Sequence, residues 1–554
     1  MKRIIGIIAL LLALCALFSG CGGEQIIQNV ETLSPEELDN TFRVAMAIAD
    51  ITPKNAVYLE GYEGKDQWSL STPDKFTSDL LARILLVQKG EECLVFLNLE
   101  YAVSDANHQY NSISSTCMER IAQICQTEQE NILLSNTHTH QANLVLEESS
   151  EDNIVRAVEQ AYQNLAPAKI GTGVVNTQYG ISRSNNYTMD PDKPYDNRMT
   201  VIRFDNAQTG EPIGLVYSVP MHNTMLGNAP GSRQKHNLLN CEFTGYASRA
   251  LEEQFGSKNN PFVAMHINGF YGNAGPYVDG KYYADSVEEL KEFGEEFAEE
   301  IAAAYKNIKT YAVTGEVKAA YIKDAIPTNK EDRSFAATFK NLDEMPMYMS
   351  VGAFGDIAVI GVNFEPFSII GARLKAEAPY TTVLPAANVH GWRGYIPTKE
   401  TFESHQYVSE AECSPGKTPF DASAEEIFYE KALNALCDLA EVTLTRVPFQ
   451  QNGTQTGAGV YNFVPENVQT LDRLVISFGQ QARTDCASEF EVLMFDESGN
   501  LCKTERFANN SVNYLGIDLE DKTVASVSVV VTERYGGGSV EELTPVIWGI
   551  QYAK

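Results

Sequence analysis

The sequence predicts a large mixed α/β domain, with sheets covered by helices, followed by a small all-β sandwich domain. From Phe42 onward, strand-like apolar runs alternate with helical stretches. Most of these runs are apolar on both faces, which is typical of a sheet that helices cover. After Pro448, glycine-bearing turns separate short strand-like runs and the helical patterns stop. A β-sandwich is built in this way.

The first residues predict a secretory signal that ends in a lipobox-like sequence. A short basic start is followed by an apolar stretch over residues 4–18 and then by Ser19-Gly20-Cys21. This stretch is too short to span a membrane. We expect cleavage before Cys21 and lipidation of its thiol, which would anchor the protein to the outer face of a bacterial membrane. An uncleaved anchor would leave the same topology. Residues 1–20 are therefore the predicted signal, and residues 21–41 a tether.

Composition limits the partners and the size of the core. The chain has 554 residues, 44% of them hydrophobic, which is enough for one large domain and a smaller one. A net charge of −31 argues against binding to nucleic acid or to anionic lipid. Any attachment to the membrane must then come from the lipid bound covalently to Cys21. Ten cysteines include no CxxC pair, and Cys486 and Cys502 could form a disulfide in an oxidising compartment.

Residues 42–446 carry the alternating pattern of the large domain. The predicted strands are Cys93 to Leu99, Ile132 to Ser135, Val201 to Phe204, Phe262 to Ile267 and Ile357 to Val362. The predicted helices are Ser114 to Gln126, Gly245 to Phe255, Ser286 to Lys306 and Ala424 to Ala440. Long polar loops interrupt them at residues 184–198, 227–240 and 271–283, and such loops at strand ends are where sites are usually built.

Residues 447–554 are the predicted sandwich domain. Its strand-like runs are Leu474 to Phe478, Glu489 to Phe495, Val524 to Val531 and Val546 to Tyr552. A module of this kind on a surface protein could bind glycans or another surface ligand.

Two histidines follow one predicted strand. The run Ile132 to Leu134 continues into Ser135-Asn136-Thr137-His138-Thr139-His140. Side chains two residues apart on an extended segment share a face, so both imidazoles are expected at one strand end. There they could bind a metal, or divide metal binding and proton transfer between them. The alternative is an ordinary hydrogen-bonded histidine pair.

Other strand ends offer further ligands. His222 follows an apolar run, and Glu365 follows the strand ending at Val362, at the start of a helical run. Two neutral histidines and a carboxylate are a common catalytic zinc set that leaves one position for water. Alternatively, His222 is a satisfied loop residue and Glu365 simply favours a helix N-terminus. His266 competes as a ligand, but a histidine inside a strand is more often a core residue.

An ordered set of motifs resembles the neutral (non-lysosomal) ceramidase family. The resemblance runs from about Ala45 to Tyr407 and includes most of the large domain. The motifs are Ala49-Asp50-Ile51-Thr52, the segment from Ser135 to His140, Ser182-Arg183-Ser184, Met221-His222, Gly245-Tyr246-Ala247-Ser248, Phe364-Glu365 with Gly371 and Arg373, and Tyr395-Ile396-Pro397-Thr398.

The resemblance implies roles for particular residues. It assigns zinc binding to His138, His222, Glu365 and Tyr395, and it places His140 and Arg183 at the reacting centre. Without the resemblance, Tyr395 would be interpreted as an ordinary half-buried aromatic residue.

One loop departs from the family. The family carries its catalytic serine in a Gly-Asp-Val-Ser-Pro-Asn loop, whereas this chain has Gly272-Asn273-Ala274-Gly275-Pro276-Tyr277. Asn273 and Gly275 thus replace the aspartate and the serine of a loop expected to face the substrate. Its backbone could still approach the metal or donate N–H groups to an oxyanion.

These observations predict one of two functions. The first prediction is a zinc-dependent amidase that cleaves an N-acyl substrate, a ceramide-like lipid or another small molecule, through zinc-activated water. His140 would act as general acid or base, and Arg183 would orient the substrate. The second is a surface-binding lipoprotein that keeps the metal fold without catalysis. A serine hydrolase using Ser248 or Ser368 is disfavoured, because neither serine lies in a Gly-x-Ser-x-Gly elbow.

Overall fold

A computed structural model describes most of the chain. The described residues are 33–59, 70–103, 112–143, 145–185, 188–190, 195–226, 237–329, 342–403, 419–451, 459–478 and 486–554. The predicted signal and Cys21 lie outside these ranges. No helix among the described residues is long and apolar enough to cross a membrane.

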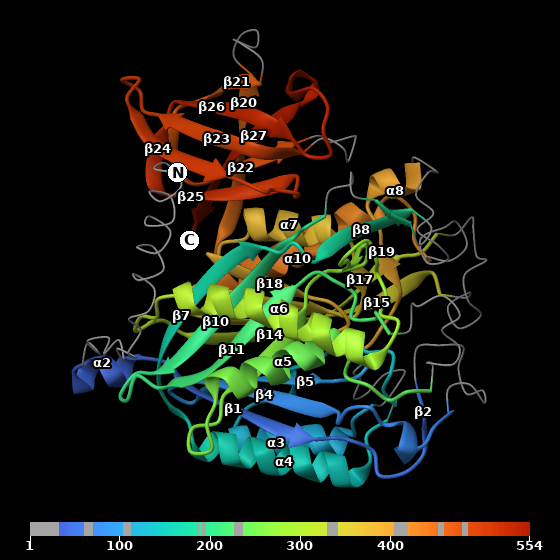
Figure 1. The fold of residues 1–554 in the computed structure, drawn as a ribbon. Helices are drawn as coiled ribbons and strands as arrows, with labels where there is room; N and C mark the ends of the chain where they lie inside the picture. The colour runs from blue at the N-terminus through green and yellow to red at the C-terminus, as the bar shows by residue number, and fades with distance from the viewer. Residues whose placement is uncertain are drawn as a thin grey trace, which may run out of the picture.

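Two stacked sheets form the centre of the large region (Figure 1). The larger sheet has eight strands in the order β12-β11-β10-β7-β1-β4-β5-β6. Their bounds are β1 Arg43–Asp50, β4 Leu81–Lys89, β5 Glu92–Leu99, β6 Ile132–Asn136, β7 Ala166–Asn176, β10 Arg198–Asn206, β11 Pro212–Val219 and β12 Val263–Asn268. The sheet curls toward a barrel, since β12 at one edge also contacts β4, β5 and β6.

Four helices cover the outer face of this sheet. They are α3 (Ser115–Cys125), α4 (Glu148–Gln163), α5 (Glu242–Phe255) and α6 (Val287–Asn307). In α6, Phe293, Phe297 and Ile301 recur every fourth residue and are buried, as an amphipathic helix requires. Ser286 caps this helix by accepting a hydrogen bond from the Glu289 N–H. Of these four, α3, α5 and α6 were predicted and are confirmed, with ends that shift by a few residues, whereas α4 was not predicted.

The second sheet packs against the inner face of the first. Its order is β14-β15-β16-β18, with bounds Val317–Pro327, Glu344–Phe354, Ile357–Val362 and Thr382–Ala386. Helices α7 (Ser368–Glu377) and α10 (Ala424–Ala440) cover its other face. In β16, Ile357 and Val359 join the core between the sheets, while Ala358 and Ile360 join the core beneath the helices. Burial on both faces explains why this strand is apolar throughout.

Short strands surround one end of the two sheets, as Figure 1 shows for β8, β17 and β19. One group has the order β13-β8-β9, and β17 pairs with β19. Their bounds are β8 Gly180–Asn185, β9 Thr188–Asp190, β13 Ala274–Pro276, β17 Glu365–Pro366 and β19 Tyr395–Ile396; the remaining pair is β2 (Val57–Tyr58) with β3 (Leu70–Ser71). Helix α8 (Lys399–Glu403) follows β19.

The last strands form one continuous hydrogen-bonded set of eight. Their order is β24-β23-β26-β21-β20-β27-β22-β25. Their bounds are β20 Thr443–Gln451, β21 Val460–Pro465, β22 Gln469–Phe478, β23 Ala487–Phe495, β24 Leu501–Phe507, β25 Tyr514–Val524, β26 Ser526–Arg534 and β27 Pro545–Ala553. The strands predicted in this region are confirmed. However, β20 pairs with β27 over its first part and with β21 over its last part, so the predicted boundary at 447 falls inside a strand.

The terminal strands share packing with the large region rather than standing apart. Ile369 and Ala372 of α7 belong to the same apolar cluster as the terminal strands. Arg473 of β22 donates hydrogen bonds to the carbonyls of Ala378 (2.7 Å) and Tyr380 (3.1 Å), just beyond the end of α7. The division into two domains therefore stays a prediction.

Two smaller expectations need correction. The end of the predicted tether contains a short helix, α2 (Pro35–Asn40), because Ser34 and Glu37 form a capping box around its start. Cys486 and Cys502 do not pair. Each thiol instead donates to a backbone carbonyl, Cys486 to Val512 at 3.0 Å and Cys502 to Met494 at 3.2 Å.

Candidate metal centre

The predicted ligands meet where parallel strands end. Strand β6 runs parallel to β5, β11 to β12 and β16 to β18. His138 follows β6, His222 follows β11, and Glu365 follows β16. The carboxyl ends of neighbouring parallel strands lie at one edge of a sheet, where open α/β folds usually bind ligands. The two stacked sheets thus bring all three side chains to one place.

His138 reaches this place through a turn and not through the extended strand. The strand β6 ends at Asn136, and His138 has a φ of 63°, in the left-handed region. The Asn136 side chain supports this turn by accepting a hydrogen bond from the His138 N–H at 3.0 Å. The imidazoles of His138 and His140 still converge, with Nε2 atoms 3.2 Å apart. Their convergence was predicted, but the strand alternation given as its cause was wrong.

Backbone carbonyls fix the tautomers of two histidines. The Nδ1 of His138 lies 3.0 Å from the Ala102 oxygen, and the Nδ1 of His222 lies 2.8 Å from the Ala274 oxygen. Because a carbonyl only accepts, each Nδ1 carries the hydrogen and each Nε2 keeps a lone pair. Burial lowers the pKa of both imidazoles to about 4. Both rings are therefore neutral near pH 7, as metal binding requires.

Glu365 lies in a short strand and not in the first turn of a helix. Its backbone N–H donates to the Gly394 oxygen at 3.1 Å, and β17 pairs in parallel with β19 so that Glu365 lies opposite Tyr395. Helix α7 begins later, at Ser368. The interpretation that Glu365 merely favours a helix N-terminus is therefore wrong, because its side chain is directed by strand pairing.

Separations between the side-chain atoms fit a small cation. Oε1 of Glu365 lies 3.8 Å from Nε2 of His138, and its Oε2 lies 3.4 Å from Nε2 of His222. The hydroxyl of Tyr395 is 3.0 Å from Nε2 of His222. Ligands at about 2.0–2.2 Å from one tetrahedral metal would be roughly 3.3–3.6 Å apart. His138, His222 and Glu365, which we call the metal group, could hold a metal ion.

The polar atoms of the metal group are not satisfied by the protein alone. Burial by itself would raise the pKa of Glu365, but its polar neighbours, the Asn388 amide among them, hold it below its usual range, so the group is a carboxylate. Its Oε2 is buried and has no hydrogen-bond partner among the described residues. It faces the lone pair of His222 Nε2, and two acceptors in contact repel each other unless a cation lies between them. The donor set therefore fits a metal.

Sequence reasoning missed Asn388 and Tyr271. The Nδ2 of Asn388 lies 3.0 Å from Glu365 Oε1, 3.2 Å from His138 Nδ1 and 2.6 Å from the Tyr271 hydroxyl. The Tyr271 ring packs against both imidazoles, with centroid distances of 5.0 Å to His138 and 4.5 Å to His222. Asn388 follows the apolar strand β18, so the strand-end rule that found Glu365 could also have found this residue.

Arg183 occupies the space beside Gly275. A Cβ atom built on Gly275 would lie 2.7 Å from Cδ of Arg183, closer than such atoms approach. Burial, and next to it the charge of Arg183, lower the pKa of His222. Asn273 has a structural role. Its side-chain oxygen accepts a hydrogen bond from the Ser368 N–H at 2.7 Å, and its backbone oxygen accepts one from the Arg183 N–H at 2.7 Å.

The other candidates are not part of the metal group. His266 is buried against Tyr217, as expected of a core residue, and His390 contacts the Ser350 hydroxyl at 2.8 Å. Ser248 contacts the Tyr217 hydroxyl at 3.1 Å, and Ser368 accepts from the Asp196 N–H at 3.1 Å. These contacts are packing roles and do not resemble an activated nucleophile. His108, His236 and His405 lie outside the described residues.

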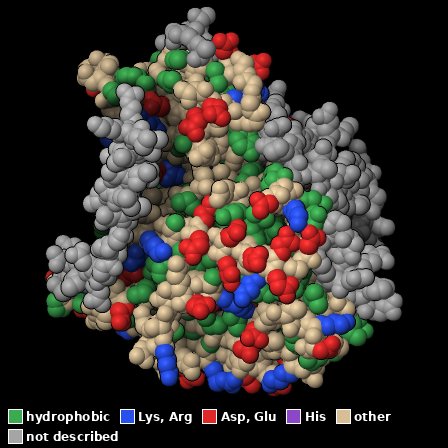
Figure 2. Space-filling view, viewed as in Figure 1, with side chains coloured by type: hydrophobic (Ala, Val, Ile, Leu, Met, Phe, Trp, Pro, Cys, Tyr) green, Lys and Arg blue, Asp and Glu red, His purple; other side chains and the backbone are tan. Residues whose placement is uncertain are grey.

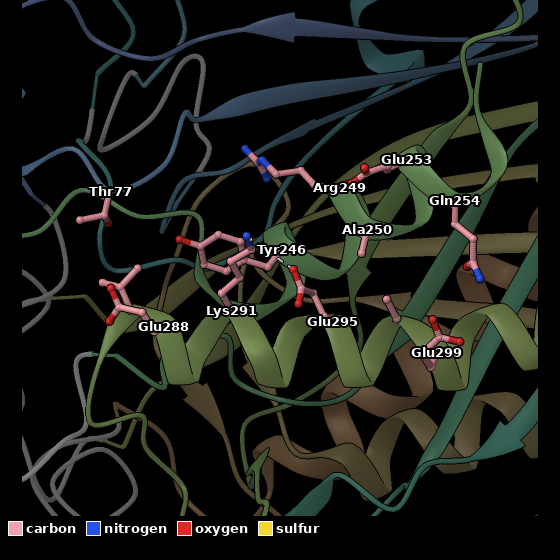
Figure 3. Close-up of a pocket in the computed structure, with 12 residues that line it drawn as sticks. Thr77, Tyr246, Arg249, Ala250, Glu253, Gln254, Glu288, Lys291, Glu295 and Glu299 are labelled. Carbon is pink, nitrogen blue, oxygen red and sulfur yellow. Dashed lines mark ion pairs between the residues drawn. The ribbon is translucent and has the colours of Figure 1, made fainter. Parts of the chain in front are cut away.

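A surface groove lies between α5 and α6, apart from the metal group (Figure 3). Its volume is about 830 Å³. Glu288, Lys291, Glu295 and Glu299 of α6 line it opposite Tyr246 and Arg249 of α5. Acidic side chains are also scattered over the face shown in Figure 2. The groove contains no residue of the metal group, so it is a separate feature of the surface.

Solved structures with a similar fold are ceramidases. Neutral ceramidase from Pseudomonas aeruginosa matches with a TM-score of 0.56 and 15% identity over 92% of this chain and 98% of that one. A structure described as ceramidase complexed with C2 matches with a TM-score of 0.55 and 14% identity over 92% of this chain and 99% of that one. No family model matches, and no curated protein matches in sequence. The chain thus has a ceramidase-like fold, and the alignment includes residues of the terminal strands.

Proposed function

We propose that this protein is a zinc-dependent hydrolase, an amidase that cleaves an N-acyl substrate. The observation that carries the proposal is the metal group itself: two neutral imidazoles converge on a buried carboxylate whose Oε2 has no hydrogen-bond partner among the described residues. The ceramidase-like fold supports hydrolysis as the chemistry. The name of those neighbours motivates a ceramide-like lipid as the first substrate to test, with other N-acyl compounds beside it.

His138, His222 and Glu365 would hold the zinc, with Tyr395 as the fourth ligand. Imidazole nitrogens and oxygen donors are ordinary zinc ligands, and the Tyr395 hydroxyl lies within ligand spacing of His222 Nε2. Bound zinc would lower the pKa of water toward about 7 and supply a nucleophile at neutral pH. The Ala102 and Ala274 carbonyls would keep both Nε2 lone pairs directed at the ion.

His140 and Arg183 would serve the substrate. The half-buried His140 ring lies beside His138 and outside the metal group. There it would act as general acid or base, taking a proton from the attacking water or giving one to the leaving amine. Arg183 carries a permanent charge and would bind the carbonyl oxygen as negative charge develops on it. Asn273 and Gly275 would shape the loop beneath Arg183.

Zinc content and turnover test this proposal together. Purified protein should contain about one zinc per chain and release free amine from N-acyl sphingosine, an N-acyl amino acid or another N-acyl compound. His138→Ala and His222→Ala should lose both zinc and turnover. His266→Leu is the matched control, because this buried histidine lies outside the metal group and should keep both. Protein that binds no zinc would disprove the proposal.

A second function is favoured by one observation. Arg183 fills the place where the resembling family carries its catalytic serine, so the chain could bind an N-acyl ligand without cleaving it. Zinc-loaded protein that binds N-acyl compounds in calorimetry, with no amine released by any of them, would support this surface-binding lipoprotein. Turnover that depends on zinc would exclude it.

We also propose that Cys21 anchors the mature protein to the outer face of the bacterial membrane. The motivation is the short apolar start followed by Ser19-Gly20-Cys21. Cells expressing the full chain should incorporate labelled palmitate into the wild type and not into Cys21→Ala. Equal labelling of the two proteins would exclude lipidation at this cysteine.

A further inference from the structure

Strand β13 supports the metal group from one side. The Ala274 oxygen accepts hydrogen bonds from both the backbone N–H and the Nδ1–H of His222, at 3.1 and 2.8 Å. On its other edge, β13 pairs antiparallel with β8, the strand that carries Arg183. A displacement of this three-residue strand would therefore move a metal ligand and Arg183 together.

Gly275, in the middle of β13, is where the Arg183 side chain crosses the backbone. A Cβ at this position would lie 2.7 Å from Cδ, 3.1 Å from Cγ and 3.7 Å from Nε of Arg183. No positive φ requires glycine at this position. The requirement is steric, and it involves the middle of the arginine side chain and not its mobile tip.

We propose that Gly275 is a positioning residue whose missing side chain lets Arg183 lie across β13 and hold its guanidinium beside the metal group. This inference rests on the proposed function for its catalytic meaning, but the contact itself does not. A serine at 275 would have to displace Arg183 before its hydroxyl could face the metal. The site is thus arranged around an arginine, and residue 275 would not be the nucleophile in hydrolysis.

The contact can be tested without any assay of turnover. Gly275→Ala should lower the Tm of the wild type by about 2 °C, because an extra methyl group overpacks a filled site. In an Arg183→Ala background, where Cγ and Cδ are gone, the same substitution should lower the Tm much less. Gly272→Ala is the matched control in the same loop, since its Cβ would meet the Glu365 backbone oxygen at 2.5 Å whether or not Arg183 is present.

Turnover tests the positioning role. Gly275→Ala and Gly275→Ser should both keep zinc and lower kcat/KM by about 10- to 100-fold, because a misplaced reacting group costs this much. Equal Tm losses from Gly275→Ala in the two backgrounds, or a Gly275→Ser variant that turns over faster than wild type, would overturn the inference. Wild-type protein that binds zinc but has no turnover would count against the proposed function alone, and the Tm comparison would still decide whether Gly275 makes room for Arg183.

Discussion

Two buried clusters of ionisable side chains lie within the large region, and they differ in whether the protein completes them. The first, which we call the arginine network, consists of four charged residues that pair with one another: Arg83, Glu100, Arg249 and Glu252. The second is the metal group. Arg83 and Glu100 are fully buried, as are the three residues of the metal group, so the free-energy cost of removing charge from water applies to both clusters.

Every carboxylate of the arginine network meets a guanidinium. Glu100 is fully buried, and its Oε1 lies 2.7 Å from both Arg83 Nη1 and Arg249 Nη1. Glu252 accepts from Arg83 Nε at 2.7 Å and from its Nη2 at 3.1 Å. The charges sum to zero, and nothing from outside the chain is needed. A cluster of this kind is structural.

The metal group carries a carboxylate without such a partner. Glu365 receives a hydrogen bond from Asn388 on Oε1, whereas its buried Oε2 faces the lone pair of a neutral imidazole. A cation would satisfy the oxygen and both nitrogens at once. Burial alone therefore does not distinguish the two clusters, whereas the unpartnered Oε2 of Glu365 does.

The largest expected effect comes from breaking the arginine network. Arg83→Met should lower the free energy of unfolding by about 3–5 kcal/mol, because it takes one guanidinium from the buried Glu100 and from the partly buried Glu252. The loss should be the same with zinc and with a chelator, and urea denaturation under both conditions measures it. A loss that depends on zinc would mean that the two clusters are coupled and that the comparison between them is wrong.

The next effect separates the clusters by their need for metal. Zinc at 100 times its Kd should stabilise the wild type by about 2.7 kcal/mol. Glu365→Gln should remove this gain, since the new amide is a poor zinc ligand. In zinc-free protein, the same substitution should cost little, because an amide N–H can donate to the lone pair of His222 Nε2. A zinc-free variant that is much less stable than the wild type would show that Glu365 serves the fold.

Asn388→Ala should lower zinc affinity by about 10- to 100-fold. Its amide contacts Glu365 and His138, and residues that orient metal ligands have effects of this size. Competition with a chromophoric chelator measures the Kd. Asn510→Ala is the control, because this buried asparagine bonds the Ala487 and Val512 carbonyls among the terminal strands and should change stability without changing affinity. Equal zinc affinities for the two variants would show that Asn388 does not support metal binding.

Sequence patterns predicted the parts of the site that depend on strand ends. His138, His222 and Glu365 were found because each follows an apolar run, and the stacked parallel strands bring such positions together. The same patterns predicted most of the covered sheets, because burial on both faces leaves a clear apolar signature. These signals are local, so a single sequence is enough to reveal them.

Other features depend on contacts between distant segments, and the sequence does not carry them. The positive φ of His138, the position of Asn388 between two ligands, and the path of Arg183 across Gly275 all arise from packing. In the terminal region the short strands were predictable, but the sharing of β20 between two neighbours was not, since strand pairing is a long-range choice.

The smallest effect concerns His266, which lies near the arginine network. Burial, with a contribution from Arg83, lowers its pKa from 6.5 to about 3, so it is neutral in the folded chain at every pH above that value. Its ring nitrogens have no hydrogen-bond partner among the described residues. Between pH 6.5 and about 3 the unfolded chain binds a proton here that the folded chain does not, so stability is lost as the pH falls through this range.

His266→Leu should remove that loss. Relative to the variant, the wild type should lose roughly 0.7 kcal/mol of unfolding free energy between pH 7 and pH 6. Denaturation of the zinc-free proteins at the two pH values measures the difference, and groups common to both proteins cancel. A difference that does not change with pH would show that His266 binds a proton as readily in the folded chain as in the unfolded chain. A buried histidine that does so needs an anionic partner. The arginine network would then include a charge beyond its four residues.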